Sequence, residues 1–178
     1  KIKSAVKKHR ISYSLANRDR MDKRQFADKD LIIAVGGDGT FLRAAQFTDG
    51  QLLLGVNADV KDKEGFFMKA DKNNFEAELT KIINGNFKTI KLPRLEAYLN
   101  GKKIESFALN EFFIGARKAY HAAKYTIEIN SQKERQKSSG VLISTPMGSH
   151  AWAKACCSKT MPFDSKNYQF VVREPYER

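Results

Sequence analysis

The stretch LIIAVGGDGTFLRAA, residues 31–45, contains the side chains of this sequence best placed to do chemistry. Asp38 lies at its centre, after a short apolar run and before a helix-like one. Gly36, Gly37 and Gly39 can adopt positive φ and let backbone N–H groups approach a ligand closely. The N-terminus of the helix that follows would carry partial positive charge and favour phosphate. The segment therefore predicts a phosphate-binding loop with a carboxylate inside it.

The role of this carboxylate stays open on its chemistry alone. The loop matches neither G-x-x-x-x-G-K-[ST] nor G-x-G-x-x-G, so it is neither a Walker A loop nor a dinucleotide fingerprint. Asp38 could accept the proton of an alcohol that attacks a phosphoryl group. It could help to hold the Mg²⁺ that accompanies ATP. It could instead form an Asx turn and cap the following helix.

The elements that position this loop alternate between strand and helix up to residue 92. The apolar runs at 30–35 and 51–57 are typical of strands buried on both faces of a parallel sheet, and 40–47 has a helical pattern. The helical pattern is clearest at 73–86, with an Asn as N-cap and Gly85 at the C′ position. Its expected buried face comprises Phe75, Leu79, Ile82 and Ile83. Residues 1–92 therefore predict a Rossmann-like α/β domain.

Residues 93–178 carry a different pattern, in which apolar and polar residues alternate. Asn100-Gly101 stands between two such runs and predicts a type I′ hairpin. Further strands are expected at 124–130, 140–145 and 168–172, with one short helix beginning near Ser149. This half is expected to be an antiparallel β-sandwich. The expected first strand of the α/β domain and a partner for the last strand are both missing, so both ends suggest a longer polypeptide.

Composition narrows the class of protein. The chain has 178 residues, of which 42% are hydrophobic, and a formal net charge of +12, so a folded core and an anionic partner are expected. No apolar run is long enough to span a membrane, and the N-terminus lacks the apolar region of a signal peptide. Cys156 and Cys157 are adjacent, which disfavours a disulfide between them and predicts reduced thiols in an intracellular protein.

Three ordered motifs resemble those of the NAD kinase family. GGDGT is the signature of the superfamily that joins NAD kinases with diacylglycerol and sphingosine kinases. ALNEFFIG, residues 108–115, is similar to the Asn-Glu motif of NAD kinases, and SSGVLISTPMGSHAW, residues 138–152, to their glycine-rich dinucleotide loop. GVNADVKDKEGFF, residues 55–67, resembles the G-x-N-x-G-x-x-G-F segment of the family. A lipid kinase would share only the first motif.

The resemblance implies phosphoryl transfer from ATP or polyphosphate, with Mg²⁺, to the 2′-hydroxyl of the adenosine ribose of NAD. Asp38 would be the base or the orienting group, Arg43 would face nucleotide phosphate from the helix, and Phe66 would pack on a ring of the substrate. Asn110 and Glu111 would bind the ribose or adenine. The phosphate loop would comprise Gly36, Gly37, Gly39 and Thr40, and the NAD-binding residues Asp38, Gly39, Arg43, Phe66, Asn110, Glu111, Lys137, Ser139, Ser149, His150, Ala151, Trp152 and Ala155.

Alternatives exist for several of these residues. Asn110 and Glu111 could form a solvated strand edge, and Phe66 could be an ordinary core residue. His150 fits a loop residue near the ligand better than a catalyst. With three histidines and no H-x-x-x-H motif, a protein-bound zinc or other metal site is not expected.

The sequence also departs from the family pattern. Ser139 stands where most members have an aspartate, and this removes a carboxylate expected at the nicotinamide end. The Lys-Ser-Ser-Gly form resembles the branch that includes the mitochondrial enzymes of animals. A cytoplasmic location is expected, with the mitochondrial matrix as the alternative. Trp152 replaces a tyrosine and keeps a stacking surface. By resemblance, the protein is expected to be a homodimer or homotetramer.

Three other functions compete with NAD phosphorylation. A dinucleotide-binding module without transfer activity is favoured by Ser139 and by the apparent incompleteness of the ends. A lipid kinase is disfavoured by the STPMGS loop and by the lack of a membrane-seeking amphipathic stretch. A nucleic-acid binder would need aromatic residues interleaved with Lys and Arg on one face, whereas the aromatic residues here alternate with acids and small residues at least as often. Neither nucleic acid nor membrane is therefore an expected partner.

Overall fold

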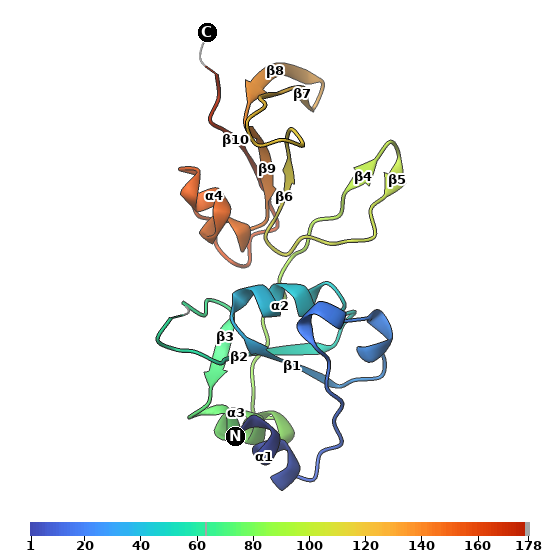
Figure 1. The fold of residues 1–178 in the computed structure, drawn as a ribbon, viewed down its shortest axis with the longest axis vertical. Helices are drawn as coiled ribbons and strands as arrows, with labels where there is room; N and C mark the ends of the chain where they lie inside the picture. The colour runs from blue at the N-terminus through green and yellow to red at the C-terminus, as the bar shows by residue number, and fades with distance from the viewer. Residues whose placement is uncertain (63, 177–178) are drawn as a thin grey trace. The chain divides into compact units, whose positions relative to one another are not determined.

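The computed structural model describes residues 1–62 and 64–176, and the chain divides into two compact units, Lys1–Ile90 and Lys91–Arg178. The first unit contains a parallel sheet with helices, and the second is rich in antiparallel strands (Figure 1). This arrangement confirms the expected fold class, an α/β domain followed by a β-rich domain.

The sheet of the first unit has three parallel strands in the order β1-β2-β3, namely β1 (Leu31–Gly36), β2 (Leu52–Asn57) and β3 (Met68–Asp71). Helix α2 (Asp38–Ala45) lies on one face, whereas α1 (Ile2–Lys8) and α3 (Phe75–Ile83) lie on the other (Figure 1). Because α2 begins directly after β1, the glycine-aspartate loop falls at the carboxyl end of β1, where ligands of open α/β sheets bind.

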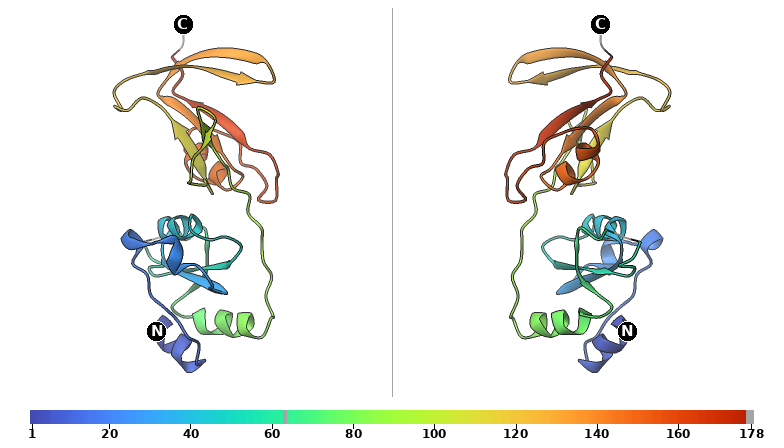
Figure 2. Two further views of the ribbon diagram at one scale, coloured as in Figure 1. Left: turned by 90° about the vertical axis from the view of Figure 1, so that its right-hand side faces the viewer. Right: turned by 90° about the vertical axis from the view of Figure 1, so that its left-hand side faces the viewer.

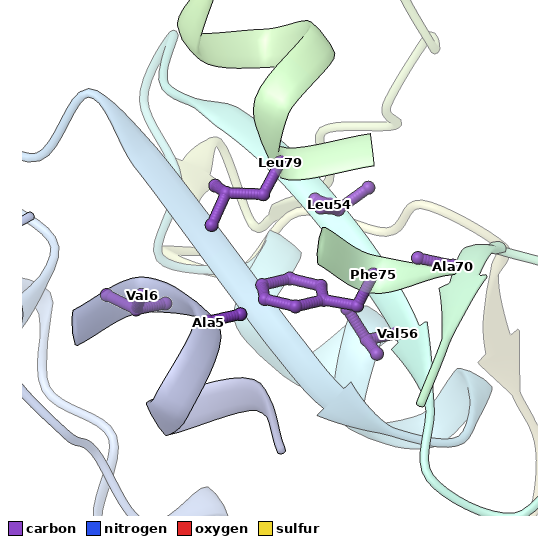
Figure 3. Close-up of a cluster of buried hydrophobic side chains, with 7 residues drawn as sticks. All are labelled: Ala5, Val6, Leu54, Val56, Ala70, Phe75 and Leu79. Atoms are coloured by element: carbon purple, nitrogen blue, oxygen red, sulfur yellow. The ribbon is translucent and has the colours of Figure 1, made fainter. Parts of the chain in front are cut away.

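The core of this unit lies between the sheet and the helices α1 and α3. Figure 3 shows the seven buried residues that form it, which are Ala5, Val6, Leu54, Val56, Ala70, Phe75 and Leu79. On α3, Phe75 and Leu79 are one helical turn apart and face the sheet together. The helix ends at Asn84, and Gly85 follows with φ of +71°, as the C′ position predicts.

Two local expectations about burial were wrong. Strand β1 is not buried on both faces, since Val35 is 45% exposed. Ile83, the last residue of α3, is 48% exposed and does not belong to the buried face of that helix. The expected Asn N-cap of α3 is confirmed as Asn74, whose Oδ1 accepts from the Asp71 N–H at 2.7 Å and makes no bond to the helix backbone.

The second unit holds three small antiparallel sheets. The largest has the order β10-β9-β6, with β6 (Glu111–Ile114), β9 (Gly140–Ser144) and β10 (Gln169–Arg173). Two hairpins accompany it, β4 (Tyr98–Leu99) with β5 (Lys102–Lys103), and β7 (Ala123–Ile129) with β8 (Gln132–Ser138) (Figure 2). Asn100 and Gly101 have φ of +52° and +76°, which confirms the type I′ turn between β4 and β5.

Short helices complete the two units. In the first, the 3-10 helices η1 (Arg18–Arg20) and η2 (Lys23–Gln25) precede β1. In the second, the expected short helix is a 3-10 turn, η3 (Gly148–His150), followed by a single helical turn, α4 (Trp152–Ala155). Cys156 and Cys157 are free thiols, as predicted. Among the described residues, no helix has the length and apolar character that a membrane crossing requires.

Candidate functional site

A pocket of about 310 Å³ lies over the glycine-aspartate loop of the first unit. Its lining consists of Arg18, Gly37, Asp38, Gly39, Thr40 and Glu64. Four of these six residues were predicted as phosphate-loop or catalytic residues from the sequence. The loop therefore presents its backbone and the Asp38 carboxylate to one open cavity.

The Asp38 side chain is held by the backbone of a second segment. Its Oδ2 accepts a hydrogen bond from the Phe66 N–H at 3.0 Å, and its Oδ1 accepts one from the Phe67 N–H at 2.8 Å. Asp38 is the first residue of α2 after the N-cap Gly37, and no side-chain cap bond is present. Asp38 therefore does not cap α2, which was one of the roles left open by the sequence. Since a carboxylate offers about four lone-pair sites, two remain for a ligand.

The loop glycines work differently from the expectation. None of Gly36, Gly37 and Gly39 has positive φ, and Gly37 is extended with φ of −113°. Instead, a Cβ on Gly36 would lie 2.5 Å from the Thr40 Oγ1. Gly36 is therefore needed because it lacks a side chain at a point of close approach.

Two arginines, Arg43 on α2 and Arg18 on η1, have different surroundings. Arg43, predicted to face phosphate, is exposed on α2; its Nη1 donates to Gln46 Oε1 at 3.1 Å and its guanidinium lies 4.8 Å from the centre of the Phe47 ring. The guanidinium of Arg18 lies against Gly39 instead. Among the described residues, Arg18 and not Arg43 lines the pocket.

Phe66 is 40% exposed, so the alternative that it is an ordinary core residue does not hold. Its ring meets that of Phe67 edge to face at 5.3 Å, and Phe67 stacks on Phe41 of α2 at 4.8 Å. The exposed Phe66 ring therefore rests on the buried rings of Phe67 and Phe41. The backbone N–H of Phe66 binds the Asp38 carboxylate beside it. This geometry suits a ring that contacts a planar ligand.

In the second unit, the adjacent residues Asn110 and Glu111 each have a buried side-chain oxygen without a hydrogen-bond partner among the described residues. The two atoms are Asn110 Oδ1 and Glu111 Oε2. Burial raises the pKa of the Glu111 carboxyl above its ordinary value. Buried polar atoms without partners are rare and point to a missing donor. A solvated strand edge, the alternative for this pair, does not agree with that burial.

The turn after β9 is bonded tightly to Asn110. The Thr145 N–H donates to the Asn110 carbonyl oxygen at 2.8 Å, and Thr145 Oγ1 donates to the Leu109 carbonyl oxygen at 2.5 Å. A Cβ on Gly148 would overlap the same Asn110 carbonyl oxygen. The glycine of the third motif therefore permits the contact that brings the second and third motifs together.

Ser149 and His150 both bind the segment around Met161. Ser149 is fully buried; its Oγ donates to the Pro146 carbonyl oxygen at 2.6 Å and accepts from the Met161 N–H at 2.8 Å. His150 Nε2 is 3.0 Å from the Met161 carbonyl oxygen, and its ring lies 4.7 Å from that of Phe163. Both side chains hold the turn in place in the present structure.

Ala151, Trp152 and Ala155 form the exposed side of the turn and of α4. The Trp152 ring lies 5.2 Å from that of Phe113 on β6, and the guanidinium of Arg173 lies 4.9 Å from its centre. Trp152 is 39% exposed, so part of its ring remains available for stacking.

Ser139 faces a carboxylate from the neighbouring strand end. Its N–H donates to the Arg173 carbonyl oxygen at 3.1 Å. A hydrogen bond from its side chain, and then the charge of Arg173, hold the pKa of the Glu174 carboxyl below its ordinary value. Lys137 is exposed, and its Nζ lies 3.9 Å from the centre of the Tyr176 ring. A carboxylate is therefore present next to the position where the sequence lacks one.

Sequence reasoning missed Arg18, Glu64, Arg173 and Glu174. None belongs to one of the three motifs, although Glu64 lies in the segment 55–67 that resembles a further family pattern. Arg18 precedes Gly39 by 21 residues and is brought there by η1. Glu174 follows β10, which pairs with the strand that Ser139 precedes. A positive φ of 45° at Glu174 is a further feature that only the structure reveals.

Comparison with known proteins finds similarity to NAD kinases, the family that the three motifs resemble. The model of the ATP-NAD kinase N-terminal domain matches residues 1–87. A probable NADH kinase of Oryza sativa subsp. japonica is 28% identical over 97% of the chain and 60% of its own length. The NAD kinase of Flavobacterium johnsoniae is 33% identical over 83% of the chain and 51% of its own length. The chain thus spans about half to three fifths of these relatives.

The fold has a close counterpart among solved structures. An NAD kinase from Archaeoglobus fulgidus, solved in complex with ATP, superposes with a TM-score of 0.84 at 23% identity. The superposition covers 99% of the chain and 68% of that protein. Both units of the chain therefore have the fold of that relative.

Proposed function

The chain belongs to the NAD kinase family, and on that basis we propose that it transfers the terminal phosphate of ATP, or of polyphosphate, to the 2′-hydroxyl of the adenosine ribose of NAD, giving NADP. The observation that carries the proposal is the Asp38 carboxylate, fixed by two backbone N–H groups at the wall of the loop pocket. The formal net charge of +12 favours the approach of two polyanionic substrates.

Phosphoryl transfer depends mainly on positioning and charge neutralisation. In the proposed step, the ribose oxygen attacks the terminal phosphorus while its proton passes to Asp38. The new O–P bond forms as the bond from that phosphorus to the bridging oxygen breaks, and ADP leaves with the electron pair. Because both Asp38 oxygens are already oriented, the carboxylate need not reorganise to accept the proton.

Mg²⁺ is proposed to arrive with ATP and to neutralise charge on its phosphates. Asp38 and Glu64 line one pocket and offer the oxygen donors that Mg²⁺ prefers. Among the residues that the structure describes, no three His, Cys, Asp or Glu side chains gather into a metal cage. This donor set fits a metal that keeps phosphate and water ligands better than one held by protein alone.

We assign the Asn110 and Glu111 oxygens to hydroxyl or amino donors of NAD. Both oxygens are buried without a partner, which is the state that a ribose diol or an adenine amino group would relieve. Trp152 and Phe66 are proposed as exposed rings against planar parts of the dinucleotide. The relatives include a probable NADH kinase, so NADH is a second acceptor to test.

The decisive assay incubates the purified chain with ATP, Mg²⁺ and either NAD or NADH. NADP formed from NAD is detected with an NADP-specific dehydrogenase, and NADPH formed from NADH by its oxidation with an NADPH-specific reductase. Asp38→Asn is expected to lose most of the turnover while it still binds NAD in calorimetry. Asp49→Asn, an exposed carboxylate of the same unit, serves as the control and should keep wild-type turnover. NAD binding without product in the wild-type chain would identify a binding module and contradict the proposal.

A further inference from the structure

We propose that Arg18 binds the phosphates of the phosphoryl donor, a nucleoside triphosphate or a polyphosphate, in the pocket over the glycine-aspartate loop. This inference rests on the proposed function and adds to it a residue outside all three motifs. It also moves the expected phosphate-binding arginine from α2 to the 3-10 helix η1.

The fold places Arg18 against Gly39, the loop residue that directly follows Asp38. η1 is capped by Asn17, whose Oδ1 accepts from the Asp19 N–H at 3.0 Å. From this helix the side chain reaches Gly39, where a Cβ would lie 3.3 Å from Arg18 Nη2. The guanidinium therefore lies over the start of α2, close to the N–H groups that favour an anion.

Among the described residues, Arg18 forms no ion pair with an acidic side chain. Arg24, six residues further along the chain, shows the contrast, since its Nη2 forms an ion pair with Asp22 at 2.9 Å. Asp38 lines the same pocket, but its oxygens accept the N–H groups of Phe66 and Phe67. An arginine without an acid, beside backbone donors, is suited to the planar recognition of phosphate oxygens.

The surroundings of Arg43 argue for the same assignment. Its guanidinium is engaged by Gln46 and by the face of Phe47. Both partners lie toward the C-terminal end of α2, whereas Gly39 and Thr40 are at the beginning of that helix. Of the two arginines, Arg18 is the one whose charge the loop pocket contains.

The test measures binding of ATP and of inorganic tripolyphosphate to the full chain by calorimetry at fixed ionic strength. Arg18→Ala should weaken both by about tenfold or more, the effect of removing one charge-assisted hydrogen bond. Arg18→Lys should fall between, because it keeps the charge and loses the planar fork. Arg20→Ala, on the same exposed 3-10 helix, is the matched control and should bind as the wild type does.

A second variant tests the contact itself. Gly39→Ala should weaken tripolyphosphate binding in the wild-type chain and add little in the Arg18→Ala chain, since both changes then act through one side chain. Circular dichroism checks that each variant is folded. Equal affinity of Arg18→Ala and wild type, equal losses with Arg20→Ala, or no binding of either probe by the wild type would overturn the inference.

These outcomes separate the inference from the proposed function. If the wild type binds tripolyphosphate through Arg18 but makes no NADP, the proposed function fails and the inference stands. If NADP forms and Arg18→Ala leaves both the KM for ATP and the tripolyphosphate affinity unchanged, the inference fails and the proposed function stands.

Discussion

The Asp38 carboxylate accepts a hydrogen bond of 2.8 Å from the backbone N–H of Phe67, across 29 residues of sequence. The second bond, from the Phe66 N–H, makes the contact bidentate. A residue predicted for chemistry therefore also joins α2 to the segment that leads into β3. The two roles can be separated by experiment, because one acts on stability and the other on turnover.

Asp38→Asn is expected to lower the free energy of unfolding by about 1 to 3 kcal/mol, because an amide can accept only one of the two N–H bonds and leaves the other donor unpaired. Urea unfolding followed by circular dichroism measures this change. Glu64→Gln, the other carboxylate of the pocket, is the matched control and should unfold like the wild type. Equal stability of Asp38→Asn and wild type would show that the two bonds contribute nothing.

Glu111→Gln is expected to stabilise the protein at about pH 7, because it removes a buried charge without a partner. Because the folded-state pKa of Glu111 is raised, there is a pH range between the ordinary and the folded pKa in which the folded state is protonated and the unfolded state is not. Stability of the wild type should therefore fall as pH rises from the ordinary glutamate pKa through the folded one. The difference between the two proteins should vanish below about pH 4, where both states are protonated.

Thermal unfolding of both proteins across this pH range measures the effect. Glu105→Gln, an exposed glutamate of the same unit, provides the control and should show no such divergence. Parallel curves for Glu111→Gln and wild type would mean that Glu111 does not carry the buried charge.

Gly148→Ala is expected to cost about 2 to 3 kcal/mol of stability and to weaken NAD binding, since its Cβ would overlap the Asn110 carbonyl oxygen and push the turn away. Gly101→Ala has no atom within 4 Å of the new Cβ, and its positive φ alone should cost about 1 to 2 kcal/mol. Denaturant unfolding and NAD calorimetry on both variants compare the two. NAD affinity should fall only in Gly148→Ala.

Ser139→Ala is expected to raise the pKa of the Glu174 carboxyl toward its ordinary value, because the ionised form loses a hydrogen bond. The charge of Arg173 remains and should keep that pKa somewhat lowered. Carbon-detected NMR titration of the glutamate side chains measures it, and Glu96, which is held by Lys103, serves as the unaffected reference. An unchanged titration of Glu174 would show that the serine does not bind it.

Periodicity and turn chemistry were enough to predict most of the elements. The spacing of Phe75 and Leu79 and the Asn100-Gly101 pair depend on contacts within a few residues, so the sequence contains them directly. Val35 and Ile83 are exposed, and their exposure depends on which other elements pack against them. That information is tertiary, and an apolar run does not encode it.

The site divides in the same way. The glycine-aspartate loop could be predicted because a strand end and a helix start are adjacent in the chain. The Asp38 bonds to Phe66 and Phe67, the position of Arg18 and the Glu174 carboxylate beside Ser139 all join distant segments. No pattern within a short window could have revealed them. The motifs in the sequence predict the site residues, and the fold determines which residues lie beside them.

Strand β9 is the middle strand of its sheet, with β6 on one side and β10 on the other. Its Leu142 is fully buried and pairs with Phe113 and with Val171. Glu111 on β6 and Arg173 on β10 are therefore both positioned by their pairing with β9, although they lie on opposite edge strands. Engineering of nucleotide preference at either edge should leave Leu142 untouched, since a change in its volume would disturb both edges together.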